Sequence, residues 1–91
     1  MLSAEAKISP ETLEQHGWVP FATKTEGDKL TFREFYRPQT QPLVLLRLYY
    51  EPPRIVIYRN NQDIFTHHHI LFDGRIELIR TLKFVEELLG L

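Results

Sequence analysis

The segment "LVLLRLYYEPPRIVIYR" (43–59) decides the fold of this chain. Its two ends, 43–50 and 55–58, are rich in apolar, aromatic and β-branched residues, which favour strands. Between them stand Pro52 and Pro53, which have no backbone N–H to donate and therefore interrupt a ladder. Because the break is so short, it indicates two antiparallel neighbours, with 43–50 as an inner strand.

Further strands are predicted on both sides of this pair. Toward the N-terminus, 18–25 and 29–37 read as two strands joined by the Gly-containing turn "EGDK" (26–29). Toward the C-terminus, a fifth strand is expected over about 64–72. The Asp73-Gly74 pair that follows is interpreted as the turn that leaves it.

The two ends of the chain have helical signals. In "SPETLEQHG" (9–17), Ser9 can cap the first amides, Pro10 suits the first helical position and Gly17 ends the helix. Near the C-terminus, 78–89 carry an apolar stripe at helical spacing, and Gly90 is the stop. The chain is therefore predicted to be an α+β domain of order α-β-β-β-β-β-α, an antiparallel sheet of about five strands packed with two helices. Residues 1–8 are expected to be a flexible arm, and 9–91 a single small domain.

Composition narrows the classes of function. The 91 residues are 43% hydrophobic and 25% charged, as in ordinary soluble domains. Cysteine is absent, which excludes disulfides, Cys-zinc sites and a thiol nucleophile. Ser3 and Ser9 are the only serines, and no Gly-rich phosphate loop occurs, so no enzyme and no cofactor are expected. With neither a signal peptide nor a long apolar run, a cytoplasmic protein without membrane contact is predicted.

The alternation of side chains along the strands sorts the sheet into two faces. The sorting assumes that Asn61-Gln62 centre a two-residue hairpin, which places Arg54 opposite His69, Val56 opposite His67 and Tyr58 opposite Phe65. One face is predicted to be core and carries Leu46, Leu48, Tyr50, Ile55, Ile57, Ile64, His68, Ile70 and Phe72. The other is aromatic and cationic and carries Leu45, Arg47, Tyr49, Arg54, Val56, Tyr58, Phe65, His67, His69 and Leu71.

The aromatic and cationic face is where a function is expected. Tyr, Phe and Arg are enriched at protein interfaces, so the first interpretation is a non-catalytic protein-interaction or homodimerisation module. A homodimer would also cover apolar residues of this face, such as Leu45 and Val56, that are otherwise expected to be exposed. The predicted interface residues are Arg47, Tyr49, Arg54, Tyr58, Phe65, His67 and His69. Another interpretation is that the N-terminal helix covers this face, while the apolar stems of the arginines lie on it and their charged ends reach the solvent.

The alternative function is a nucleic-acid- or metal-binding accessory protein that uses the same Tyr, Arg and His side chains. Nucleic acid is not favoured, because a formal net charge of −1 lacks the basic excess that neutralises phosphates. For metal, His67 and His69 would lie about 6.6 Å apart along one strand face. Zinc needs a third ligand, here His16 or a carboxylate, and the arginine expected opposite His69 opposes a cation. No metal site is therefore predicted.

The C-terminal pattern Phe72-x-Gly74-x-Ile76, followed after five residues by "LKFxxELxGL" (82–91), resembles a known group of sequences. It is similar to the tail of small uncharacterised Bacteroidetes and prophage-type proteins. Those proteins begin with a short helix and a Gly-aromatic pair like Gly17-Trp18, and carry an Asn-Asn hairpin like Asn60-Asn61. The resemblance implies a fold of this kind and a phage-related origin, and it implies no activity. The three histidines at 67–69 and the Pro52-Pro53 turn depart from the pattern.

Overall fold

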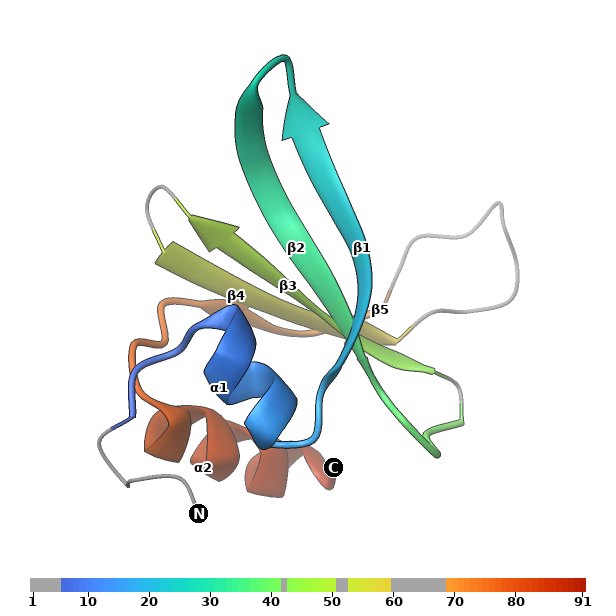
Figure 1. Ribbon diagram of the computed structural model, residues 1–91. Helices are drawn as coiled ribbons and strands as arrows, with labels where there is room; N and C mark the ends of the chain where they lie inside the picture. The colour runs from blue at the N-terminus through green and yellow to red at the C-terminus, as the bar shows by residue number, and fades with distance from the viewer. Residues whose placement is uncertain (1–5, 42, 51–52, 60–68) are drawn as a thin grey trace.

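A five-stranded antiparallel sheet carries two helices on one of its faces (Figure 1). The computed structural model describes residues 6–41, 43–50, 53–59 and 69–91. The sheet follows the order of the chain, β1-β2-β3-β4-β5, and the predicted α+β class and element order are confirmed. The elements are α1 (Pro10–Gln15), β1 (Val19–Glu26), β2 (Lys29–Arg37), β3 (Val44–Tyr50), β4 (Pro53–Arg59), β5 (His69–Gly74) and α2 (Ile79–Leu89).

The first helix begins and ends as its sequence predicts. The Ser9 side chain accepts a hydrogen bond from the Thr12 amide at 3.1 Å, and the Thr12 hydroxyl accepts one from the Ser9 amide at 2.8 Å. This reciprocal pair satisfies two donors that the first turn leaves free. Pro10 occupies the first helical position, and Gly17 follows the helix with a φ of 99°, in the left-handed region that glycine tolerates best.

The segment before the first helix is tied to the segment before the second. We expected residues 1–8 to be an arm outside the domain. In its described part, the Ile8 amide donates to the Glu77 carbonyl at 2.9 Å and the Ile79 amide donates to the Ala6 carbonyl at 2.8 Å. Residues 6–8 therefore pair with the chain just ahead of α2. Within the described ranges, neither helix is long and apolar enough to cross a bilayer.

The main core lies between the sheet and the two helices. Leu46, Leu48, Ile55 and Ile57 all point into it, as the predicted sorting of these two strands requires. Leu46 pairs with Ile57 and Leu48 with Ile55 across β3 and β4, and residues directly opposite each other share a face. The helices contribute Leu13, Ile79 and Leu82, all buried. Removing one such Leu side chain would cost about 2–5 kcal/mol.

The pairing of β5 differs from the prediction. Arg59, and not Arg54, lies opposite His69, so the predicted register is wrong. The expected two-residue hairpin at Asn61-Gln62 lies outside the described residues. The strand runs from His69 to Gly74, and the Asp73-Gly74 pair lies inside it instead of forming a turn. Glycine suits this position because a Cβ there would approach the Phe72 ring to 3.1 Å. The rest of the predicted strand, 64–68, lies outside the described residues.

Two of the three register shifts among the described strands accompany an exposed large apolar side chain. A register shift in the β4–β5 ladder places Ile70 opposite Tyr58, where it is 57% exposed, while Leu71 packs against the main core. We expected the reverse for both residues, because alternation alone ignores a bulge. A second shift, between Pro20 and Ala22 of β1, leaves Phe21 unpaired, 57% exposed and edge-on to Tyr36 at 6.0 Å.

Candidate functional site

The sheet face opposite the helices is the candidate site, and we call it the second face. It collects four of the residues predicted as an interface, namely Arg47, Tyr49, Arg54 and Tyr58. Among the described residues, the same face also carries Phe21, Ala22, Lys24, Phe32, Glu34, Tyr36, Leu43, Leu45, Val56, Ile70 and Asp73. No residue of α1 or α2 belongs to the apolar cluster on this face, so the interpretation in which the first helix covers it is wrong.

The centre of the second face is already buried in a single chain. Leu45 is 2% exposed and Val56 is 7% exposed, so the expectation that a second protomer must cover them is wrong. Long side chains from the neighbouring strands surround them. Arg47 stands directly opposite Val56, and Tyr36 stands directly opposite Leu45. The accessible part of the face is therefore its rim of larger side chains, which are partly or mostly exposed: Phe21, Phe32, Tyr36, Arg47, Tyr49, Arg54 and Ile70.

A buried carboxylate organises this centre. Glu34 on β2 is only 7% exposed, and its Oε2 accepts a hydrogen bond from Arg47 Nε at 2.6 Å. The Tyr58 hydroxyl donates to the same oxygen. The Arg47 guanidinium also lies 4.7 Å from the Phe32 ring centre and 4.9 Å from that of Tyr58. Three strands are thus joined by one ion pair, one hydrogen bond and two cation–π contacts.

Burial and neighbouring charges determine the protonation states of Tyr58 and Arg47 in this network. Burial is the largest cause that raises the pKa of Tyr58, and the Glu34 carboxylate raises it further. Burial lowers the pKa of Arg47, but hydrogen bonds to Glu34 and Tyr49 and the nearby Tyr58 outweigh it, so that pKa is raised. At neutral pH Tyr58 is therefore a neutral donor and Arg47 a cation.

The second arginine of this face is paired in the same manner, closer to solvent. Arg54 lies 4.7 Å over the Tyr49 ring, and its Nε is 3.0 Å from Asp73 Oδ1. Both partners of this ion pair are nearly half exposed. The Tyr49 ring in turn contacts Phe32, with ring centres 5.2 Å apart. Each arginine of the second face is thus matched by one carboxylate.

The remaining predicted site residues are not brought into this cluster. Phe65 and His67 lie outside the described residues, as does the side chain of His69. Within the ranges that the structure describes, no three His, Asp or Glu side chains gather in an arrangement that could hold a metal ion. His16, the candidate third ligand, instead makes a hydrogen bond with Glu86, its Nε2 lying 2.6 Å from Oε2.

A second buried carboxylate, Glu86 of α2, lies on the helix side of the molecule. It is 4% exposed and contacts both His16 and the Arg37 guanidinium. Arg37 Nη1 also donates to the His16 carbonyl at 3.0 Å, and the guanidinium stacks over Trp18 at 4.5 Å. Burial, followed by the positive charges of Arg37 and Lys83, lowers the pKa of His16. This cluster ties the end of α1 to β2 and α2.

The sequence interpretation missed both buried glutamates. Glu34 follows the period-2 alternation between Phe32 and Tyr36, so it falls on the same aromatic face as they do. Glu86 stands four residues after Leu82, on the buried stripe of α2. An isolated carboxylate at an apolar-face position was the signal available in each case.

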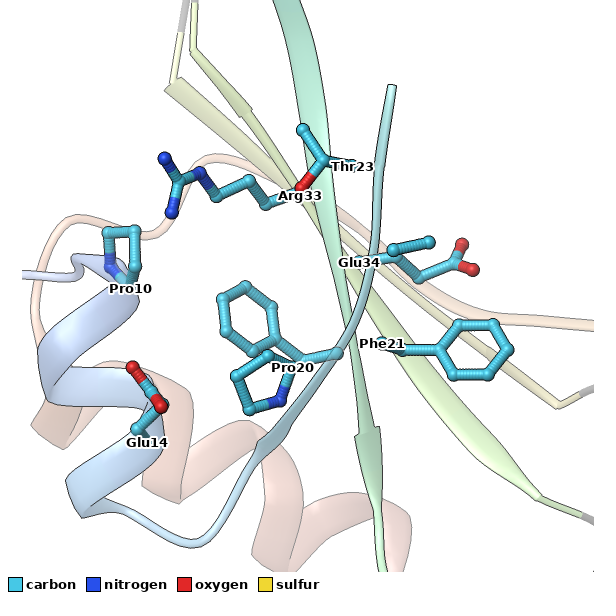
Figure 2. A pocket seen from close by; sticks show the side chains of 9 residues that line it. Pro10, Glu14, Pro20, Phe21, Thr23, Arg33 and Glu34 are labelled. Carbon is cyan, nitrogen blue, oxygen red and sulfur yellow. The ribbon is translucent and has the colours of Figure 1, made fainter. Parts of the chain in front are cut away.

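A groove of about 330 Å³ separates α1 from the β1–β2 hairpin (Figure 2). Pro10 and Glu14 line its helix side, while Pro20, Arg33 and Phe35 line its sheet side. Figure 2 shows Phe21 and Glu34 pointing away from the helix. The groove therefore opens on the helix side of the sheet and is separate from the rim of the second face.

Comparisons of the chain with known proteins identify no related protein. No protein-family model matches the chain, and searches of curated proteins and of solved structures give no match either. The resemblance to Bacteroidetes and prophage-type proteins thus stays a prediction.

Proposed function

We propose that this protein is a non-catalytic protein-interaction domain that binds its partner through the rim of the second face. The observation that carries the proposal is the network that the buried Glu34 and Tyr58 form with Arg47, whose side chain is 30% exposed and belongs to the rim. It holds an arginine between two aromatic rings on a sheet face that neither helix covers. Aromatic residues and arginine are enriched at interfaces, and Tyr and Arg are enriched among the side chains that dominate binding energy.

The fixed geometry of these side chains supports binding further. A flexible arginine or tyrosine loses rotamer freedom when a partner immobilises it, which costs about 0.5–1.5 kcal/mol per side chain. Here Arg47 is held by its bond to Glu34 and by two rings before any partner arrives. Arg54 is likewise held between Tyr49 and Asp73. The cost of ordering is therefore met during folding.

The charge balance favours a protein over a nucleic acid. Binding to single strands combines aromatic stacking with cations that neutralise phosphates. The rings of Phe32, Tyr36 and Tyr49 could stack bases, which is the observation that favours this alternative. Its weakness is that the Glu34 and Asp73 carboxylates already neutralise Arg47 and Arg54. The metal alternative depends on His67 and His69 and gains no support from the described residues.

Three further proposals accompany this function. The absence of catalysis is supported by Glu34 and Glu86. Each of these buried carboxylates forms an ion pair with an arginine of the same chain, which leaves it less able to act on a substrate. A cytoplasmic location is supported by the lack of cysteine. A phage-related origin rests on the C-terminal pattern alone.

Site-specific photo-crosslinking tests the proposed function. A benzophenone amino acid replaces Phe32 on the second face, and a control protein carries it at Glu11, an exposed position on α1. In nuclease-treated cell extract, position 32 is expected to give a discrete protein adduct that position 11 does not give, and the purified partner should then bind the unmodified domain. Adducts at position 32 that disappear with nuclease treatment would instead favour the nucleic-acid alternative. Identical adducts at both positions would refute a specific second face.

A further inference from the structure

The outer side of α2 exposes an apolar pair. Phe84 is 60% exposed and Leu88 is 72% exposed, although the opposite side of the same helix is buried against the core. The two residues are four positions apart, so they are neighbours on the helix surface. Arg80 precedes Phe84 by four positions and extends the same row. We call Arg80, Phe84 and Leu88, with the adjacent Glu87, the α2 ridge.

The charges of the α2 ridge oppose the dipole of their own helix. The N-terminal end of a helix is partially positive and its C-terminal end partially negative, so acidic residues are favourable in the first turn and basic residues in the last. In α2 the first turn has no acidic residue and contains Arg80, while the last turn has no basic residue and contains Glu87. Leu78, at the N-cap, also provides no side-chain cap. Within one chain, this arrangement is unfavourable at both ends.

Pairing with an antiparallel copy of the same helix makes the charges of Arg80 and Glu87 favourable. If two α2 helices pair about a two-fold axis near Phe84, Arg80 lies beside Glu87 of the partner subunit, and this contact occurs twice. Each helix end then meets the charge that its dipole favours, and the apolar pair is covered in the middle. A parallel pair would instead bring Arg80 against the partner's Arg80.

We infer that this protein forms a reversible homodimer through the α2 ridge, in an antiparallel arrangement. The contact is small, because an eleven-residue helix is only about 16 Å long. It falls below the size of stable interfaces, so the dimer forms at high micromolar concentration and dissociates on dilution. Since α2 lies on the opposite side of the sheet from the second face, the second face of each subunit stays accessible in the dimer (Figure 1). This inference does not depend on the proposed function. It places the homodimer interface on α2, whereas the sequence predicted it on the second face with Tyr49 and Tyr58.

Sedimentation velocity over a concentration series tests the inference. The wild type is expected to change from monomer to dimer between about 10 and 1,000 µM, since weak transient contacts dissociate in this range. Phe84→Ser should remain a monomer throughout. Arg80→Glu and Glu87→Arg should each weaken the dimer about tenfold, because two symmetric attractions become repulsions. An equimolar mixture of these two variants should restore dimerisation as a heterodimer, since opposite charges then face each other between positions 80 and 87 of the two chains.

The control is Tyr49→Ala, which alters the second face and should dimerise like the wild type. A wild type that stays monomeric over the whole series overturns the inference. So does a dimer that Tyr49→Ala abolishes and Phe84→Ser does not, since the second face would then be the dimer interface. Failure of the two charge variants to restore each other would overturn the antiparallel arrangement. None of these outcomes decides whether a different protein binds the second face.

Discussion

Replacing Arg47 by Met tests whether the buried network of the second face is as strong as its geometry implies. The substitution keeps a long apolar side chain over Phe32 and Tyr58 but leaves the Glu34 carboxylate, 7% exposed, without its cation. Breaking a buried ion pair on one side typically costs about 3–5 kcal/mol. The Arg47 side chain is 30% exposed, so water can partly replace it, and we expect a loss of about 2–4 kcal/mol.

This loss converts into a measurable shift of the melting temperature. Unfolding entropy of about 2.1 cal/mol/K per residue gives about 0.19 kcal/mol/K for 91 residues, so each kcal/mol lowers Tm by about 5 °C. Arg47→Met should therefore melt about 10–20 °C below the wild type in a circular-dichroism scan. Arg54→Met is the matched control: it removes the same guanidinium from the same face, but from a half-exposed pair worth at most about 1 kcal/mol. Equal shifts for the two variants would refute the reasoning.

Three other predictions concern pH and backbone conformation. Burial raises the pKa of Tyr58, so its contribution to stability is complete below about pH 10 and is lost as pH rises above that value. Urea denaturation should show a smaller alkaline loss in Tyr58→Phe than in the wild type. Burial and nearby cations lower the pKa of His16, so its contribution is present above about pH 6.5 and is lost as pH falls below it. His16→Gln should lose less stability than the wild type between about pH 7 and about pH 5, and an equal loss would contradict the assignment. Gly17→Ala should cost about 2–3 kcal/mol, because its φ is 99° and the new Cβ would lie 2.7 Å from Arg37 Nη1. Gly27→Ala, with a φ of 61° and open space around it, should cost about 1 kcal/mol by the same denaturation assay.

The fold was predictable where local signals agree with one another. Ser9, Pro10 and Gly17 act within one turn of the chain, and the alternation of β3 and β4 depends only on their own sequence. The pairing of β5 was not predictable: Arg59, and not Arg54, lies opposite His69, five positions away from the predicted register. A β-bulge shifts the register by one further position without a distinctive residue to mark it. The exchange of Ile70 and Leu71 between the faces follows from that single shift.

The candidate site was predictable in its composition and not in its chemistry. Alternation correctly grouped Arg47, Tyr49, Arg54 and Tyr58 on one face. Glu34 comes from β2, which the predicted sorting did not include, and only the cross-strand register brings it beside Arg47. Glu86 meets His16 across 70 positions of sequence, a contact that helix packing determines. The position of each glutamate on an apolar face is a local signal, whereas the identity of its distant partner has none.

The central claim is that the second face binds a protein partner. Calorimetry with the partner identified by photo-crosslinking at position 32 tests it most directly, with wild type, Tyr49→Ala and Glu11→Ala compared at physiological salt. The account predicts that Tyr49→Ala weakens binding at least tenfold, roughly 1.4 kcal/mol or more, while Glu11→Ala binds like the wild type. Equal affinity of all three proteins, or a loss confined to Glu11→Ala, would contradict it.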